Sequence, residues 1–227
     1  MDESSKQLLK CPVAEPECQW LDEITRLRLQ VSELSELVAT DALTGLYNFK
    51  HFKSLLQAEM DRAKRSGIPT TLVMIDIDHF NEVNHNYGYE VGNQVLAQVA
   101  AIIKNEVRAT DCACRYAGGE FSVIFAETHL NLALKVADRI REIIADSAIH
   151  YDKGKFNITV SMGASVYMKT SIIDRDSFID SVDNYLFEAK QSGRNCICHI
   201  DYSDLSKVTE VGVDERSRLI GKKPSRD

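Results

Sequence analysis

Residues 115–125 read RYAGGEFSVIF, and this stretch decides the fold. The residues before and after Ala117-Gly118-Gly119 are typical of strands, and glycines supply the backbone conformations that a tight hairpin turn requires. The stretch therefore predicts two antiparallel strands, at residues 111–116 and 120–126. Glu120 follows the bend at once, so the hairpin carries an acidic side chain close to its tip.

Helices and strands alternate on either side of this hairpin. Residues 70–78, TTLVMIDID, predict a buried strand that ends in two carboxylates. The pattern predicts further strands at 156–165 and 195–200, and helices at 48–67, 93–108, 131–148 and 176–193. Because helices alternate with strands while the hairpin pair is antiparallel, we expect an α/β fold with a mixed sheet.

The composition divides the chain into four segments. These are a polar tail at 1–19, an amphipathic helix at 20–39, a folded domain at 40–203 and a charged tail at 204–227. The helix is predicted from apolar residues spaced four and three apart: Trp20, Ile24, Leu27, Val31, Leu34 and Val38. An isolated helix of this length is marginal, so it pairs with a second copy or packs on its own domain. The sequence leaves both arrangements open.

Charge and hydropathy exclude several classes of partner. The formal net charge is −7, which argues against a broad basic surface for nucleic acid or anionic lipid. No apolar run approaches the ~20 residues that cross a bilayer. The acidic N-terminus lacks the apolar core of a secretory signal. We therefore expect a cytoplasmic protein that binds neither nucleic acid nor membrane.

The six cysteines include two C-x-C pairs, Cys112 with Cys114 and Cys196 with Cys198. Four thiolates from two strands could bind zinc, but structural zinc sites usually draw their ligands from C-x₂₋₄-C spacing. Alternate residues of a strand share one face, and free cysteine is a common core residue. We therefore expect these cysteines to serve packing.

Asp76 and Asp78 end the predicted strand at 70–78, and alone they would fit a capping role. Five stretches taken together are more specific: DALTGLYN, DIDHFNEVNHNYGYEVGNQVLAQVA, RYAGGEF, VSMGAS and VDNYLFEAKQSGRN. Their order and spacing over residues 40–200 resemble the GGDEF family. The resemblance implies a central five-stranded sheet wrapped by helices. Active members are diguanylate cyclases: two GTP-loaded domains meet, and each 3′-hydroxyl attacks the partner's α-phosphate to form 3′,5′-cyclic di-GMP.

The resemblance implies a nucleotide site that is retained in part. Asp76 matches a metal ligand, and Asn84 matches a residue that hydrogen-bonds guanine. Lys190 and Arg194 match phosphate-binding positions and keep the charge for that role. No cofactor is required on this interpretation, and Mg²⁺ is expected only if GTP still binds.

The departures from the family cluster at the hairpin. The signature is Gly-Gly-Asp/Glu-Glu-Phe, and the ungapped alignment gives Ala117-Gly118-Gly119-Glu120-Phe121. Gly119 then replaces a metal-binding carboxylate, and strand alternation is expected to turn Glu120 away from the direction of Gly119. A gapped alignment would read Gly118-Gly119-Glu120 as Gly-Gly-Glu and restore the ligand. It shifts the following strand by one residue, which exchanges its faces, so we favour the ungapped alignment.

The guanine-binding positions depart as well. Asn93 stands where the family usually has an Asp that accepts hydrogen bonds from guanine N1–H and N2–H. A carboxylate offers acceptors to both donors, whereas an amide offers one acceptor and opposes the other with NH₂. The loss is expected to cost about 1–3 kcal/mol of guanine affinity.

A second motif, RATD at residues 108–111, resembles the family's inhibitory R-x-x-D site. The resemblance implies that Arg108 and Asp111 bind cyclic di-GMP, and that Arg139 matches a further arginine that reaches the same ligand. Guanidinium groups suit guanine O6 and N7 or phosphate, and a carboxylate suits guanine N–H groups. A surface ion pair between Arg108 and Asp111 is the alternative interpretation.

These observations predict a GGDEF protein that has lost catalysis and is not an enzyme. It would act as a cyclic di-GMP receptor, signal through an unidentified protein partner, and form a homodimer through helix 20–38 or the domain itself. Asn84, Asn93, Gly118, Gly119, Glu120, Lys190 and Arg194 would remain as a vestigial nucleotide site, with Asp76 as a vestigial metal ligand. The alternatives are a weakly active cyclase and a ligand-independent scaffold.

Overall fold

The computed structural model describes residues 23–28, 39–152 and 154–201. The chain divides into two compact units, Met1–Ala39 and Thr40–Asp227. In the first unit, residues 23–28 are helical, and Arg26 pairs with Glu23 one turn earlier. The rest of the predicted helix at 20–39, the tail at 1–19 and the tail at 204–227 lie outside the described residues.

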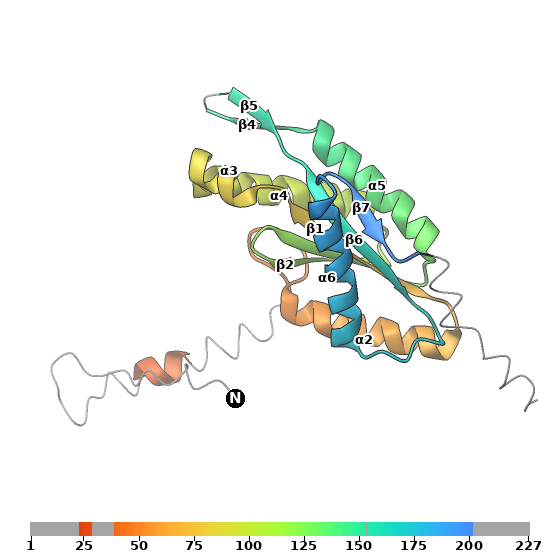
Figure 1. Ribbon diagram of the computed structural model, residues 1–227. Coiled ribbons are helices and arrows are strands. Elements are labelled where there is room, and N and C mark those ends of the chain that lie inside the picture. Colours follow the sequence, from red (N-terminus) through yellow and green to blue (C-terminus); the bar gives the residue numbers. More distant parts are fainter. Residues whose placement is uncertain (1–22, 29–38, 153, 202–227) are drawn as a thin grey trace, which may run out of the picture. The chain divides into compact units, whose positions relative to one another are not determined.

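The second unit contains the predicted mixed α/β sheet. Five strands lie in the order β2-β3-β1-β6-β7 (Figure 1). Their bounds are β1 Thr70–Ile77, β2 Cys112–Ala117, β3 Glu120–Phe125, β6 Val160–Tyr167 and β7 Ile197–His199. β1 is antiparallel to both β3 and β6, β2 is antiparallel to β3, and β6 is parallel to β7. The fold class expected from the sequence is confirmed.

Helices cover both faces of this sheet (Figure 1). Their bounds are α2 Phe49–Ser66, α3 Phe80–Tyr87, α4 Tyr89–Glu106, α5 Leu130–Asp146 and α6 Arg175–Gln191. α2 and α6 share one apolar core with the sheet, and α4 and α5 share the other. In β1, Leu72 and Met74 point to the α2–α6 core while Val73 and Ile75 point to the α4–α5 core. This alternation follows from the two-residue period of a strand.

Local signals set the helix ends where the sequence contains them. The Asn48 side chain accepts a hydrogen bond from the His51 N–H at the start of α2, and Gly67 ends the helix in a left-handed conformation. Asp174 caps α6 in the same way through the Ser177 N–H. These three residues keep α2 and α6 close to their predicted bounds.

Two elements differ from the sequence prediction. Residues 156–165, predicted as one strand, are divided between the small hairpin β4 (Ala148–Tyr151) with β5 (Gly154–Asn157) and the central strand β6. Helix α3 was not predicted. An aromatic cluster joins these elements: Tyr87 at the end of α3 stacks on Phe156 with ring centroids 4.3 Å apart, and Tyr151 packs against both rings. The contact is tertiary, so the local pattern did not reveal it.

Cys114 agrees with the packing interpretation, whereas Cys112, Cys196 and Cys198 are only half-buried. β2 and β7 are the two edge strands, so the two C-x-C pairs lie on opposite edges of the sheet. Cys114 is fully buried in the α2–α6 core, and burial raises the pKa of its thiol to about 12. Among the described residues, no helix is long and apolar enough to cross a membrane.

Candidate functional site

The site begins with two carboxylates on adjacent strands. Asp76 of β1 pairs directly with Glu120 of β3. Residues that are opposite each other in an antiparallel pair place their side chains on the same face. Here it is the α6 face, because Met74 and Ile124 on the same strands point to the α2–α6 core. Glu120 does point away from the side of Gly119, where a Cβ would meet Phe80, but this direction brings it to Asp76 and into the site.

The end of α6 adds two cations. Lys190 Nζ lies 3.1 Å from Asp76 Oδ2. Arg194 follows four residues later, and its N–H donates to the Ala189 carbonyl at 3.1 Å, so the turn continues over the helix end. The Arg194 guanidinium makes no ion pair or hydrogen bond with the described part of the chain. Lys190 is thus partly neutralised by Asp76, whereas Arg194 is available to an anion.

These groups line one pocket of about 510 Å³. Its wall includes Asp76, Gly118, Gly119, Glu120, Lys190 and Arg194, together with the start of α3. The structure thereby brings together six of the eight residues predicted for the nucleotide and metal site. Asn84 on α3 and Asn93 on α4 do not line this pocket; Asn84 is half-buried against Gly92, and Asn93 is exposed.

Burial and like charge perturb the carboxylates. Burial, and then the nearby Asp76 carboxylate, raise the pKa of Glu120 despite the opposing charge of Lys190. Burial also raises the pKa of Asp183, on α6 two turns before Lys190. Perturbed carboxylates in a cleft are a physical signature of a functional site. Asp183 lies on the same helix face as Lys190 but does not line the pocket.

Asp78 has a different role from Asp76, although both lie at the end of the strand. Asp78 is 6% exposed and accepts hydrogen bonds from Thr159 Oγ1 and Ser161 Oγ, each at 2.6 Å, and from the Asn195 N–H at 3.2 Å. Three donors occupy its oxygens, so it ties the end of β1 to the start of β6 and to the loop after α6. Asp78 also lines the pocket, but its oxygens are already engaged, whereas Asp76 pairs there with Lys190.

The hairpin tip explains why position 119 is glycine. A Cβ at Gly119 would lie 2.8 Å from Cδ1 of Phe80, closer than side chains pack. The Phe80 ring thus occupies the space in which an acidic side chain would begin. Gly118 adopts a φ of +39°, in the left-handed region that favours glycine.

The hairpin also contains a bulge. Arg115 pairs with Phe121 but Ala117 pairs with Glu120, so β2 carries one extra residue just before the glycines. Phe121 and Val123 point to the α4–α5 core, which leaves Glu120 and Ser122 on the opposite face. Whichever alignment with the family is chosen, Glu120 is the hairpin carboxylate that faces Asp76.

Arg115 fixes the hairpin to the segment that precedes α2. Its guanidinium donates to both oxygens of Asp41 at 3.2 Å and to the Gly118 carbonyl at 3.1 Å. Burial would raise the pKa of Asp41, but hydrogen bonds from Thr44 and the charge of Arg115 lower it overall. The DALTGL turn and the hairpin tip are therefore held as one unit.

The donor set suits a hard divalent cation. Mg²⁺ is commonly held by one or two protein carboxylates together with substrate phosphates. Asp76 and Glu120 supply two carboxylates, and the raised pKa of Glu120 records a repulsion that a cation would relieve. No group of three or more His, Cys, Asp or Glu side chains positioned for a metal occurs among the described residues. The residues thus fit a metal ion whose remaining ligands come from substrate and water.

The RATD motif lies after the end of α4. The Arg108 N–H donates to Asp111 Oδ2 at 3.0 Å. The other Asp111 oxygen is buried without a hydrogen-bond partner among the described residues, although the Ala126 N–H interacts weakly with the carboxyl group. Burial raises the pKa of Asp111. A cavity of about 440 Å³ is lined by Arg108, Asp111 and Lys104, among others.

Arg139 is engaged inside the domain. From α5 its Nε donates to the Glu106 carboxylate, and its Nη2 donates to the Glu106 carbonyl at 3.2 Å. Glu106 precedes Arg108 by two residues, so Arg139 reaches the same end of α4. The Arg108 guanidinium forms no ion pair with any described residue, which argues against the surface ion pair between Arg108 and Asp111.

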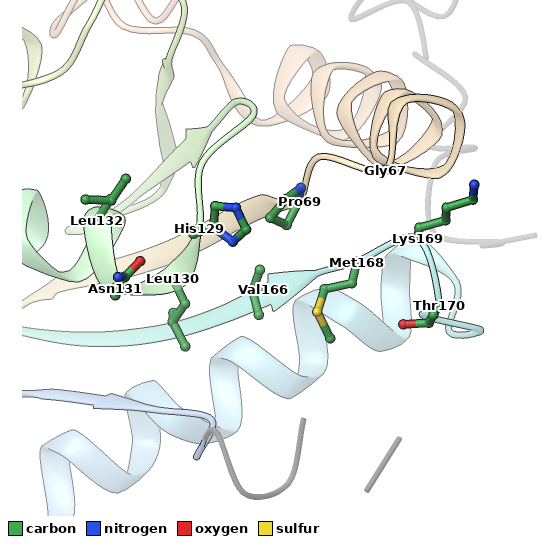
Figure 2. A pocket seen from close by; sticks show the side chains of 10 residues that line it. All are labelled: Gly67, Pro69, His129, Leu130, Asn131, Leu132, Val166, Met168, Lys169 and Thr170. Atoms are coloured by element: carbon green, nitrogen blue, oxygen red, sulfur yellow. The ribbon is translucent and has the colours of Figure 1, made fainter. Parts of the chain in front are cut away.

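A larger pocket, of about 750 Å³, shares none of its lining residues with these sites; Figure 2 shows its wall. Pro69 before β1 and Val166 and Met168 at the end of β6 contribute to its wall. Because β1 and β6 are antiparallel, this pocket is at the opposite end of the strand pair from Asp76. Its lining is mainly apolar, with Leu130 and Leu132 from α5, and includes no carboxylate.

Comparison with known proteins identifies the fold and its family. Residues 38–196 match the family model described as "Diguanylate cyclase, GGDEF domain". The chain belongs to the GGDEF family. It is 37% identical over 175 residues to Diguanylate cyclase A of Treponema denticola, covering 76% of this chain and 47% of that protein. It is 35% identical over 173 residues to the response regulator PleD of Caulobacter vibrioides, covering 75% of this chain and 38% of that protein. The chain thus spans about half or less of the length of these relatives.

Solved structures show the same architecture. The GGDEF domain of DgcB from Caulobacter crescentus, in complex with c-di-GMP, superposes with a TM-score of 0.68 at 29% identity, covering 71% of this chain and 92% of that one. The diguanylate cyclase SiaD from Pseudomonas aeruginosa, in complex with its activator SiaC, gives 0.69 at 27% identity, covering 80% and 72%. The five-stranded sheet expected from the resemblance is confirmed.

The comparisons correct one expectation. The sequence departures predicted that the protein is not an enzyme, but curated relatives that match most of this domain are named diguanylate cyclases. The match therefore points to the cyclase family. The error had a structural cause: Gly119 was taken as the loss of the hairpin carboxylate, whereas Glu120 faces Asp76 across the strands.

Proposed function

We propose that the chain is a diguanylate cyclase that binds GTP in the hairpin pocket. One observation carries the proposal: Asp76 and Glu120 are opposite one another and share a pocket with Lys190 and Arg194. Two acidic and two basic groups at one pocket are the arrangement that a metal-bound triphosphate requires. The departures at Gly119 and Asn93 make slow turnover the expected outcome.

Each group has a distinct part in this proposal. Lys190 and Arg194 bind the phosphates, and the Gly118–Gly119 backbone lets the substrate approach the hairpin without side-chain obstruction. Asp76 and Glu120 would hold Mg²⁺, which neutralises phosphate charge when bound. Phosphoryl transfer depends mainly on such positioning of charge.

The reaction needs two copies of the chain. Each GTP 3′-hydroxyl forms a bond to the other nucleotide's α-phosphorus, and each broken phosphoanhydride bond releases pyrophosphate. Two GTP molecules thus give one cyclic di-GMP and two pyrophosphates. The hydroxyl protons pass to solvent or to a carboxylate of the site. At low protein concentration, the rate is expected to rise with the square of that concentration.

The test is direct. Purified protein incubated with GTP and Mg²⁺ is expected to form cyclic di-GMP slowly, and Asp76→Asn and Glu120→Gln should each reduce the rate by about 100-fold or more. Asp61→Asn on α2, whose carboxylate accepts from Gln57 outside the pocket, is the matched control. Absence of product from the wild-type chain, or full activity of Glu120→Gln, would contradict the proposal.

We also propose that cyclic di-GMP binds at Arg108 and Asp111 and inhibits the domain. The buried Asp111 oxygen without a regular partner supports this, because it can accept from guanine N–H groups. The unpaired Arg108 guanidinium supports it as well. Calorimetry with cyclic di-GMP is expected to give micromolar binding that Arg108→Ala weakens about tenfold or more. Equal binding by the variant would overturn this second proposal.

A further inference from the structure

The loop after α6 adopts an unusual backbone conformation. Gly193, Arg194 and Asn195 have φ angles of +107°, +63° and +47°. Residues other than glycine rarely adopt positive φ, because Cβ then crowds the backbone. Two such residues in succession persist only where their surroundings determine them. Arg194 is one of the pair, and its backbone conformation sets the direction of its side chain.

Asn195 is held from two sides. Its N–H donates to Asp78 Oδ2 at 3.2 Å, so the buried carboxylate at the end of β1 holds the backbone of the loop. From α5, Arg141 Nη1 donates to Asn195 Oδ1 at 3.0 Å and to the Asn195 carbonyl at 3.4 Å. The backbone N–H, the backbone carbonyl and the side-chain oxygen of Asn195 are thus all hydrogen-bonded.

Both holding groups are themselves fixed. Asp78 accepts from Thr159 and Ser161 at the start of β6, as described above. Arg141 is only 18% exposed, and its Nη2 lies 2.7 Å from Asp138 Oδ1 one turn earlier. Asp78 lines the hairpin pocket and Arg141 does not, and neither forms an ion pair with Lys190 or Arg194 within the described residues. Both contact the loop through Asn195, the residue next to Arg194.

We propose that Asp78 and Arg141 are positioning residues that hold the left-handed Arg194–Asn195 turn and so direct Arg194 into the hairpin pocket. The inference rests on the proposed function, because it assigns to Arg194 the phosphates of the bound nucleotide. Without the hydrogen bonds to Asn195 the turn relaxes to negative φ, and the Arg194 guanidinium leaves the pocket. Nucleotide affinity falls although every residue that touches the nucleotide is intact.

A double-mutant cycle distinguishes positioning from a general loss of stability. The measurement is calorimetric binding of a non-hydrolysable GTP analogue with Mg²⁺ to the full chain. Arg141→Ala and Arg194→Ala are each expected to weaken binding about tenfold. The double variant should bind no more weakly than Arg194→Ala alone, since Arg141 acts only through Arg194. Additive losses would overturn the proposal.

Arg175→Ala is the matched control. Arg175 begins α6, pairs with the exposed Asp176, and lies at the other end of that helix from Lys190. It is expected to leave binding unchanged. Thermal unfolding of each variant shows that the domain is folded at the temperature of the titration. Asp78→Asn is a second variant, expected to weaken binding in the same non-additive way.

The experiment separates this inference from the catalytic proposal. If the wild-type chain binds the analogue but forms no cyclic di-GMP, catalysis is disproved and the cycle still tests the positioning role. If the analogue does not bind, magnesium tripolyphosphate replaces it in the same cycle. Binding of neither probe would overturn the positioning proposal, because Arg194 would then serve no phosphate.

Discussion

The hairpin pocket and the RATD region differ in opposite ways from what their sequence motifs indicate. The hairpin differs from the family signature at Ala117 and Gly119. The structure nevertheless brings Asp76, Glu120 and Lys190 together there and leaves the Arg194 guanidinium unpaired within the described residues. RATD matches the R-x-x-D motif in full, yet Arg139, the third residue assigned to that site, donates a hydrogen bond to the Glu106 carboxylate. A motif therefore specifies which charges a site contains, but it does not specify whether they are available to a ligand.

The largest expected effect tests the hairpin pocket. Lys190→Ala should weaken binding of a GTP analogue with Mg²⁺ by about 10- to 100-fold, because a hydrogen bond to a charged group contributes about 1.5–3 kcal/mol. Binding of cyclic di-GMP at the RATD region should be unchanged. A similar loss for both ligands would show that the two regions are one site.

Gly119→Glu tests whether the hairpin can accommodate the acidic residue that the family signature has at this position. The new Cβ would lie 2.8 Å from Phe80 Cδ1, so the ring or the hairpin must move. Crowding of this kind costs about 1–3 kcal/mol of unfolding free energy, measurable by urea denaturation. Gly118→Glu, where no atom lies within 4 Å of the new Cβ, controls for the added charge, although its positive φ has a cost of its own. If Gly119→Glu is as stable as wild type, the Phe80 ring can move aside without a measurable cost in unfolding free energy.

Glu120→Gln tests the strain between the two carboxylates. Because the folded-state pKa of Glu120 is raised above its ordinary 4.5, the native state holds its proton more tightly than the unfolded state does. Its contribution to stability therefore falls as pH rises from about 4.5 through the folded-state pKa. The variant should be more stable than wild type at pH 7, with the advantage lost near pH 4; because the side chain is partly exposed, solvent screening keeps the gain small. A variant less stable at pH 7 would contradict this assignment.

Glu106→Gln gives the smallest expected effect and tests the RATD region. Removing the carboxylate frees the Arg139 guanidinium, which is 54% exposed in its ion pair. Exposed pairs contribute up to about 1 kcal/mol, so cyclic di-GMP affinity should rise by about two- to fivefold. Glu142→Gln, on the same helix as Arg139, is the control. A fall in affinity would show that the Glu106 pair holds Arg139 in its binding position.

Several features were predictable because their causes are local. The apolar run at residues 70–78 predicted a buried strand that ends in Asp76 and Asp78, and Gly67 and Gly193 marked the predicted ends of two helices. The hairpin followed from two glycines between strand-like segments. Lys190 and Arg194 were assigned to the site through the family resemblance, and their charge suits a phosphate ligand.

Other features depend on partners distant in the chain. The direction of Glu120 is set by a bulge at Ala117 and by pairing with β1, 44 positions earlier. The glycine at 119 is explained by Phe80, and the small β4–β5 hairpin by the stacking of Phe156 on Tyr87. No periodicity within any of these segments contains that information.

The sequence alone determined the family, the mixed sheet and the identity of the charged groups, because apolar patterning and motif spacing are properties of short segments. The tertiary structure decided which of those groups meet. Cross-strand register put Glu120 opposite Asp76, and Asn195, which accepts from Arg141 of α5 and donates to Asp78 just after β1, holds the turn that carries Arg194. Strand register and side-chain hydrogen bonds arise only when separate segments pack. A hairpin whose motif departs from the family signature can therefore still place two carboxylates and two cations around one pocket.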